Sequence, residues 1–267
     1  MGKNRVELIA ELSWCHMGDM LLAAEMIHAA AEAGADYAKF QTWQVKHLKP
    51  GPWDKDGRRQ IYEKAELSED DHYHLREICS NHNVEFLTSC FTMKNIDFVR
   101  SITNKVKLPG VECRNQELVQ AALDKFDEVF LSTGTTSLSE IPEVNHKDNL
   151  VLMHCVSSYP CKPELVNIKR MLRMQEIFDV PVGYSGHYPG IWDAVCAIQH
   201  GAVVVEKHFT TDNNLPGRDN KFALLPDEFK KIKEFATEGA LMHGDLIEDY
   251  LEIEQDGRDF YTGRWDG

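Results

Sequence analysis

Short apolar segments alternate along the chain with stretches whose apolar residues recur at helical spacing. The apolar segments cover residues 6–13, 37–43, 84–91, 105–110, 128–134, 150–160, 180–187 and 202–210. After the first of them, Leu22, Met26, Ala29 and Ala33 mark one face of a helix over residues 20–33. Further helices are predicted over residues 68–81, 96–102, 116–125, 168–178 and 191–200, and from residue 226 onward. Eight strands alternating with helices predict a single-domain α/β fold, the (β/α)8 TIM barrel.

Two polar stretches depart from this alternation. Residues 44–68 are rich in Lys, Gly and Pro, and their length predicts a loop over the opening of the barrel. We expect the barrel to occupy residues 1–243 and residues 244–267 to form a short tail without a domain of its own. A doubly wound open sheet is the alternative fold, but no GxGxxG motif follows the first strand.

Charge and cysteine content narrow the functional classes. The formal net charge of −14 argues against a nucleic-acid surface, which needs clustered Lys and Arg. Seven scattered cysteines without a CxxC pair fit a reduced cytoplasmic enzyme better than a disulfide scaffold. No signal-peptide core is present, and no apolar run approaches the roughly 20 residues of a membrane helix. We therefore expect a cytoplasmic protein that binds neither nucleic acid nor membrane.

Polar side chains stand at the ends of the predicted strands. In a barrel the carboxyl ends of all strands meet at one face, so these residues should converge there: Glu11, Lys39, Gln41, Ser89, Lys107, Ser132, Ser157, Ser185, His187 and His208. Two histidines near a carboxylate suit a divalent transition metal with open coordination positions. Lysines and hydroxyl groups suit a phosphate or a carboxylate. A lysine inside a buried strand, such as Lys39, needs an anionic partner.

Each of these residues also has an ordinary structural explanation. A single histidine at a strand end is more often a hydrogen-bonding wall residue than a ligand, and serine hydroxyls commonly bond the backbone. His154 lies on the strand face opposite to Ser157, so it is expected to support the barrel wall. By the same counting Glu206 shares the face of His208, whereas Lys207 points away and is expected to be structural. On residue types alone, a metal site and a structural histidine pair both stay open.

Eight motifs together resemble a known family in order and spacing. They read ELSWCHMGD, AGADYAKFQTW, FLTSCF, LSTG, MHCVSSYP, VGYSGH, EKHFT and LPGRD. They are similar to the sialic acid synthase family, the N-acetylneuraminate and related nonulosonate synthases, from about Glu11 to Asp227. The resemblance implies an enzyme that condenses phosphoenolpyruvate with an N-acylated hexosamine and releases phosphate. It also implies a barrel and a divalent metal, expected to be Mn²⁺ with Mg²⁺ or Co²⁺ as alternatives.

The resemblance implies roles for residues within these motifs. His187 and His208 would be metal ligands, and Glu11, Lys39 and Lys107 would be catalytic. The implied substrate contacts are Gln41, Ser89, Glu112, Ser132, Ser157, Ser185 and Asp219. In this set the lysines and serines would hold phosphoenolpyruvate, while the acidic residues at positions 112 and 219 would face the amino sugar.

Four departures from the family pattern accompany the resemblance. Cys15 stands where the family usually has Asn. Gly110, after Pro109, replaces a serine expected to bind phosphate, and Gly186 replaces an aspartate beside His187. The antifreeze-like carboxyl-terminal domain of the family is expected to be missing. Two alternatives therefore stay open: a non-catalytic barrel that binds a sugar or a partner protein, and a synthase with another aldose acceptor. A homodimer is an open expectation as well.

Overall fold

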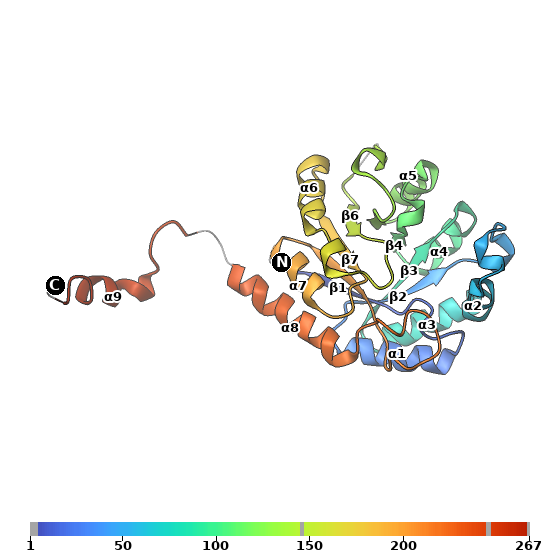
Figure 1. The fold of residues 1–267 in the computed structure, drawn as a ribbon, viewed down its shortest axis with the longest axis horizontal. Coiled ribbons are helices and arrows are strands. Elements are labelled where there is room, and N and C mark those ends of the chain that lie inside the picture. Colours follow the sequence, from blue (N-terminus) through green and yellow to red (C-terminus); the bar gives the residue numbers. More distant parts are fainter. Residues whose placement is uncertain (1–4, 145–146, 244–246, 266–267) are drawn as a thin grey trace.

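Eight parallel strands in chain order close into a barrel in the computed structural model, which describes residues 5–144, 147–243 and 247–265 (Figure 1). The strands are β1 (Glu7–Glu11), β2 (Tyr37–Thr42), β3 (Glu85–Cys90), β4 (Lys105–Leu108), β5 (Glu128–Ser132), β6 (Leu150–Cys155), β7 (Val182–Gly186) and β8 (Val204–His208). β1 pairs with both β2 and β8, which closes the sheet. The predicted (β/α)8 barrel is confirmed.

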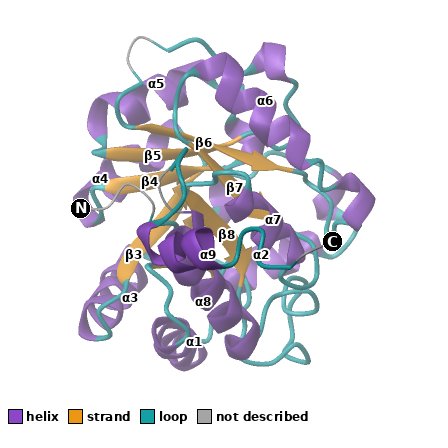
Figure 2. Ribbon diagram, turned by 90° about the vertical axis from the view of Figure 1, so that its left-hand side faces the viewer, coloured by secondary structure: helices purple, strands orange, loops and turns teal. Residues whose placement is uncertain are grey.

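Helices surround the barrel on its outside (Figure 2). They are α1 (Met20–Glu32), α2 (Arg58–Ala65), α3 (Glu69–Asn81), α4 (Ile96–Ile102), α5 (Gln116–Lys125), α6 (Ile168–Phe178), α7 (Trp192–Gln199) and α8 (Pro226–His243). The helix starts follow the capping residues, since the Asp19 side chain accepts from Leu21 N and Leu22 N before α1. Ser68 and Asp71 form a capping box at α3.

The interpretation of residues 44–68 as a loop is partly wrong. This connection contains α2 and two short 3-10 turns, Val45–His47 and Pro52–Asp54. Within α2 only Ala65 is buried, so the helix lacks the apolar stripe by which periodicity detects a helix.

Apolar side chains form two layers, one inside the barrel and one between the strands and the helices. The inner layer consists of Ile9, Tyr37, Leu87, Phe130, Val151, Met153 and Val204. Because side chains alternate between the two faces of a strand, the residue two positions further along also points inward, nearer the carboxyl end. Glu11, Lys39, Ser89, Ser132 and Glu206 follow inner-layer residues in this way. The polar strand ends therefore lie directly above an apolar floor.

A second polar cluster lies at the amino ends of the strands, below the inner layer. Lys105 Nζ is 3.1 Å from Glu128 Oε2 and 3.7 Å from Glu85 Oε2, and it donates to Tyr37 Oη at 2.5 Å. Tyr37 Oη in turn donates to Glu7 Oε2 at 3.1 Å. These partly exposed groups tie five strands, β1 to β5, together at this lower end of the barrel.

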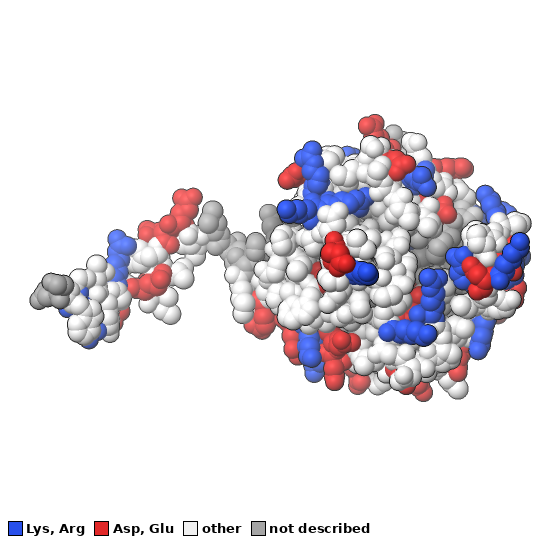
Figure 3. Space-filling view, viewed as in Figure 1, with Lys and Arg blue, Asp and Glu red and all other residues white. Residues whose placement is uncertain are grey.

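Beyond α8, residues 247–265 are exposed and include the short helix α9 (Gln255–Phe260), drawn away from the barrel in Figure 1. The predicted boundary between residues 243 and 244 borders residues 244–246, which lie outside the described ones, so this division stays a prediction. On the face shown in Figure 3, acidic and basic side chains are interspersed rather than gathered by sign. Among the described helices, none has the length and apolar character needed to cross a bilayer.

Candidate active site

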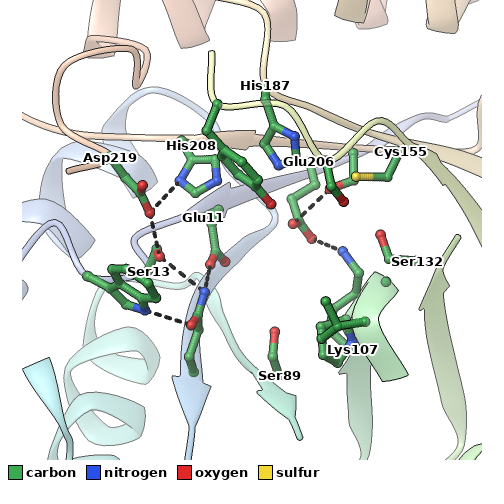
Figure 4. Close-up of a pocket in the computed structure, with 18 of the residues that line it drawn as sticks. Glu11, Ser13, Ser89, Lys107, Ser132, Cys155, His187, Glu206, His208 and Asp219 are labelled. Atoms are coloured by element: carbon green, nitrogen blue, oxygen red, sulfur yellow. Dashed lines mark hydrogen bonds and ion pairs between the residues drawn. The ribbon is translucent and has the colours of Figure 1, made fainter. Parts of the chain in front are cut away.

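A cavity of about 370 Å³ opens at the carboxyl ends of the strands, within the size range of small-ligand sites (Figure 4). Eleven of the twelve predicted site residues line it: Glu11, Lys39, Gln41, Ser89, Lys107, Ser132, Ser157, Ser185, His187, His208 and Asp219. They come from all eight strands or the loops that follow them. The expected convergence at one face of the barrel is thus observed.

Two buried lysines and two carboxylates form the floor of the cavity. Lys39 Nζ makes an ion pair with Glu11, donates to Ser89 Oγ at 3.0 Å and lies 3.7 Å from Glu206 Oε1. Lys107 Nζ donates to Glu206 Oε2 at 2.6 Å, and Ser185 Oγ donates to Glu206 Oε1 at 3.1 Å. Because these lysines are 2% exposed, their charge is compensated within the protein.

The pKa values on the floor follow from burial and pairing. Burial acts against the charge of Lys39, but Glu11 and Glu206 outweigh it and raise its pKa. For Lys107 burial wins over the attraction of Glu206, and the pKa is lowered. Burial alone would raise the pKa of Glu206, yet the two lysines hold it well below its usual range. An incoming anion therefore finds one firmly charged lysine and one whose proton is held less tightly.

The two predicted metal ligands stand side by side, with ring centroids 5.5 Å apart. His187 Nδ1 donates to Val156 O at 2.8 Å, which leaves its Nε2 available. Burial, followed by the neighbouring His208, lowers the pKa of His187 to about 3, so its imidazole is neutral at pH 7. His208 Nδ1 is buried without a hydrogen-bond partner in the described part of the chain and lies 3.7 Å from Asp219 Oδ2. Such an orphaned nitrogen is a sign of an unfilled ligand position.

A hydrogen-bonded chain connects Asp219 to the floor. Ser13 Oγ donates to Asp219 Oδ2 at 3.0 Å, and Gln41 Nε2 donates to Ser13 Oγ at 3.1 Å and to Glu11 Oε1 at 2.8 Å (Figure 4). Trp14 Nε1 donates to Gln41 Oε1 at 2.8 Å and fixes the orientation of this amide. Asp219 comes from the loop after β8, far along the chain, so these contacts join the loops after β1 and β8.

Glu112 is the one predicted site residue that does not line the cavity, and its role in substrate binding stays a prediction. Glu112 ends a 3-10 turn, Gly110–Glu112, and its Oε2 accepts from Asn115 Nδ2 at 2.9 Å, at the start of α5. Of this segment, Pro109, Gly110 and Val111 line the cavity instead. The turn directs the carboxylate along the rim toward the helix cap rather than into the opening.

Gly110 is a packing position as well as the site of a missing hydroxyl. A Cβ added there would lie 2.7 Å from Gly134 N and 2.8 Å from Gly134 Cα. A Cβ on Gly134 would in turn lie 2.5 Å from Ser157 Oγ. The loops after β4, β5 and β6 therefore stack closely because both glycines lack side chains.

Several residues that line the cavity were not among the predicted site residues. They are Ser13, Trp14, Arg58, Tyr62, Phe91, Pro109, Gly110, Val111, Cys155, Tyr159, Glu206 and Arg218. The alternation of side chains along a strand identifies two of them as inward-facing. Cys155 lies two residues after Met153, and Glu206 lies two residues before His208. Arg58 and Tyr62 were hidden in the segment interpreted as a loop, where they stand four residues apart on α2.

The expectations for His154 and Lys207 are confirmed. His154 Nε2 donates to Val166 O at 2.8 Å, and its Nδ1 accepts from Arg170 at 3.2 Å, away from the cavity. Lys207 Nζ is buried against Asp193 on the outer side of the barrel. Both residues hold the wall in place.

Comparison with known proteins agrees with the architecture of the site. The NeuB family model matches residues 26–248. The chain belongs to the NeuB family. An N,N'-diacetyllegionaminic acid synthase of Legionella pneumophila is 36% identical to it over 84% of this chain and 69% of the relative. A pseudaminic acid synthase of Campylobacter jejuni is 31% identical over 98% of this chain and 82% of the relative.

Solved structures extend the NeuB family assignment to three dimensions. The N-acetylneuraminic acid (sialic acid) synthetase of Leptospira borgpetersenii, in complex with citrate, superimposes with a TM-score of 0.88. It is 29% identical, and the match covers 98% of this chain and 93% of that one. A truncated 3-deoxy-D-arabino-heptulosonate 7-phosphate synthase of Thermotoga maritima, 16% identical with a TM-score of 0.71, shares the fold alone. The predicted family and enzyme class are confirmed, since NeuB relatives are named as synthases of nonulosonic acids.

Proposed function

We propose that this NeuB family protein condenses phosphoenolpyruvate with an N-acylated hexosamine to give a nonulosonic acid and inorganic phosphate. The observation that carries the proposal is the division of one cavity into two chemically different sides. Lys39 and Lys107 with four serines suit a small, highly charged anion on one side. The histidine pair, Glu11 and the chain to Asp219 suit a polyhydroxy aldehyde on the other.

The residues present fit a divalent metal in this proposal. His187 is neutral and keeps Nε2 available, and His208 Nδ1 is buried without a hydrogen-bond partner among the described residues. Across residues 5–144, 147–243 and 247–265 no group of three or more His, Cys, Asp and Glu side chains converges as a metal site. His187 and His208 would therefore hold the ion, and water and substrate would complete its coordination. When bound, Mn²⁺ would act as a Lewis acid that polarises the sugar carbonyl.

The chain's own residues supply position and proton transfer. Lys39 and Lys107 would bind the phosphate and carboxylate groups and hold C3 of phosphoenolpyruvate toward the aldehyde carbon. The bond between C3 of phosphoenolpyruvate and C1 of the sugar then forms from the enol π electrons, the aldehyde oxygen takes a proton from solvent water, and C2 becomes cationic. Glu11, beside Lys39 and Gln41, is placed to take the proton of the water that adds to C2. Collapse of the resulting tetrahedral centre breaks the C2–O bond and releases phosphate.

Phosphate release tests this function. Purified protein is incubated with phosphoenolpyruvate, Mn²⁺ and a panel of N-acyl hexosamines, including di-N-acylated ones, with plain aldoses as the alternative acceptors. We expect release only when all three components are present. Activity with plain aldoses but not with N-acyl hexosamines would show that the acceptor is a plain aldose. No phosphate release with any sugar would reject the proposal.

A further inference from the structure

A buried ion pair lies behind the two histidines, on the outer side of the barrel wall. Lys207 Nζ is 2.8 Å from both carboxylate oxygens of Asp193, and the two side chains are 3% and 1% exposed. Lys207 belongs to β8 and Asp193 to the first turn of α7. An ion pair without solvent is expensive to assemble and adds little net stability, so we looked for a use of this pair beyond packing.

The contacts of this pair reach the residues next to both histidines. Lys207 directly precedes His208, and its Nζ also donates to Tyr188 O at 2.7 Å, one residue after His187. Asp193 Oδ2 accepts from Tyr184 Oη at 3.0 Å, which ties the same carboxylate to β7. One ammonium group thus clamps the main chain after His187 to the strand that carries His208.

Gly186 leaves the space that this clamp occupies. Gly186 and Lys207 are register partners across β7 and β8. A Cβ added to Gly186 would overlap Asp193 Oδ2 and the Tyr184 ring. The carboxylate of Asp193 therefore fills the volume into which a side chain at position 186 would project. Position 186 itself carries no acidic side chain, and the carboxylate beside it comes from Asp193 on α7.

We propose that the Lys207–Asp193 pair is a positioning device that fixes the spacing of His187 and His208, with the carboxylate delivered by α7 in place of β7. This inference rests on the metal site of the proposed function. Lys207 and Asp193 do not line the cavity, so they act through the main chain and not on the substrate. Residues behind a metal site commonly change its affinity by about 10- to 100-fold.

The experiment measures Mn²⁺ affinity of the full chain by calorimetry and by electron paramagnetic resonance, without substrates. Lys207→Met should weaken Mn²⁺ binding about 10-fold, and Asp193→Asn, which keeps the shape of the side chain, about threefold. Asp193→Asn also serves if Lys207→Met does not fold. Lys105→Met, which removes a strand lysine at the other end of the barrel, should leave Mn²⁺ affinity unchanged. Phosphoenolpyruvate affinity of the metal-free protein should be the same in all variants.

Coupling between the two residues gives the sharpest test. Asp193→Ala should weaken Mn²⁺ binding about as much as Lys207→Met does, and the double variant Lys207→Met/Asp193→Ala should bind Mn²⁺ no more weakly than the weaker single variant, because the two residues act as one pair. Wild-type-like affinity in Lys207→Met and Asp193→Asn would overturn the inference while leaving the proposed function intact. If the wild-type protein binds no Mn²⁺, the proposed metal site is wrong, and this inference is then wrong as well. Losses that multiply in the double variant would overturn the pair as one positioning device.

Discussion

Lys105 and Lys107 stand two residues apart on β4 and face the barrel interior from opposite sides of its apolar layer. Lys105, 24% exposed, shares its charge with Glu85, Glu128 and Tyr37 at the lower end. The Lys107 side chain is buried and faces Glu206 in the cavity. Pairing, above all with Tyr37, outweighs burial and raises the pKa of Lys105, whereas burial lowers the pKa of Lys107. One strand therefore carries the same residue type in two electrostatic states.

The difference shows what the two ends of the barrel are built for. Partly exposed charges at the lower end are mutually satisfied and need nothing further. Polar groups at the carboxyl end are buried, and His208 Nδ1 and His16 Nε2 stay without hydrogen-bond partners in the described chain. Burying unsatisfied groups costs stability, which is typical of sites that await a ligand. Variants at the two ends should separate these roles.

The largest contrast is expected between the two lysines themselves. Lys107→Met should lower kcat/KM for phosphoenolpyruvate by about 100- to 1,000-fold, because a preorganised charge at the anion site is lost. Phosphate release under saturating sugar measures the effect, with Lys105→Met as the matched control on the same strand. More than a tenth of the activity remaining in Lys107→Met would contradict this role.

Removal of the metal should have the next largest effect. Chelation of the purified protein should reduce activity about 100-fold, and added Mn²⁺ should restore it. His208→Asn should need far more Mn²⁺ for half-maximal activity. Full activity in the presence of chelator, with no Mn²⁺ response in either protein, would show that the histidine pair does not hold a metal.

Gly110→Ser introduces the serine that the resemblance leads us to expect at this position, yet it should impair this protein. The new Cβ would push against the Gly134 backbone and displace the loops around Ser132 and Ser157. We expect KM for phosphoenolpyruvate to rise about 10-fold, with ΔΔG of about 1 to 3 kcal/mol against folding. Val111→Ser, at an exposed rim position of the same turn, is the control. A lower KM in Gly110→Ser would show that the loops yield and accept the hydroxyl.

Acid should destabilise the fold through the carboxyl-end loops. Burial lowers the pKa of His16 to about 4, and its Nδ1 accepts from Gly18 N at 3.0 Å. The unfolded chain binds this proton below pH ~6.5 but the folded chain only near pH 4, so stability falls with acidification between these values, by about 2 kcal/mol at pH 5. His16→Gln should remove this part of the pH dependence.

Urea unfolding at pH 7 and pH 5 measures the effect. His74→Gln, on the exposed side of α3, is the matched control and should keep the wild-type pH dependence. Equal losses of stability on acidification in wild type and His16→Gln would contradict the assignment to His16.

The smallest effect is expected at the lower end of the barrel. Lys105→Met should cost about 1 kcal/mol of folding stability, since its ion pairs are partly exposed, and should leave activity within about twofold. Thermal unfolding and phosphate release on the same preparation check both statements. A large loss of activity without loss of stability would show that the two ends communicate through the inner layer.

Strand order and most of the cavity floor could be predicted from the sequence because both depend on local rules. Apolar runs indicate the strands. Because side chains alternate between the two faces of a strand, the sequence also indicates which residue at a strand end points inward. Lys39, Ser89 and Ser132 were predicted in this way. Features that depend on loop paths were not accessible in this way. Glu112 follows a strand end closely, yet a 3-10 turn sends it to Asn115.

Helix α2 and residue Gly186 show two further limits. Only one residue of α2 is buried, so no helical spacing of apolar residues predicts this helix. It nevertheless brings Arg58 and Tyr62 to the cavity. The resemblance to the family leads us to expect a carboxylate where the chain has Gly186. Its replacement by Asp193 is visible only when α7 is packed against β8, because the two residues belong to different elements.

The inner apolar layer has a kinetic consequence. It fills the barrel below Lys39 and Lys107, so in the described chain these lysines are reached through the cavity, which Arg58, Tyr62, Arg218 and Asp219 also line. A sugar bound near Asp219 would block that path. Phosphoenolpyruvate would then have to enter first and the sugar second, in an ordered sequential scheme. An unreactive sugar analogue should accordingly inhibit uncompetitively against phosphoenolpyruvate, trapping it in a closed ternary complex.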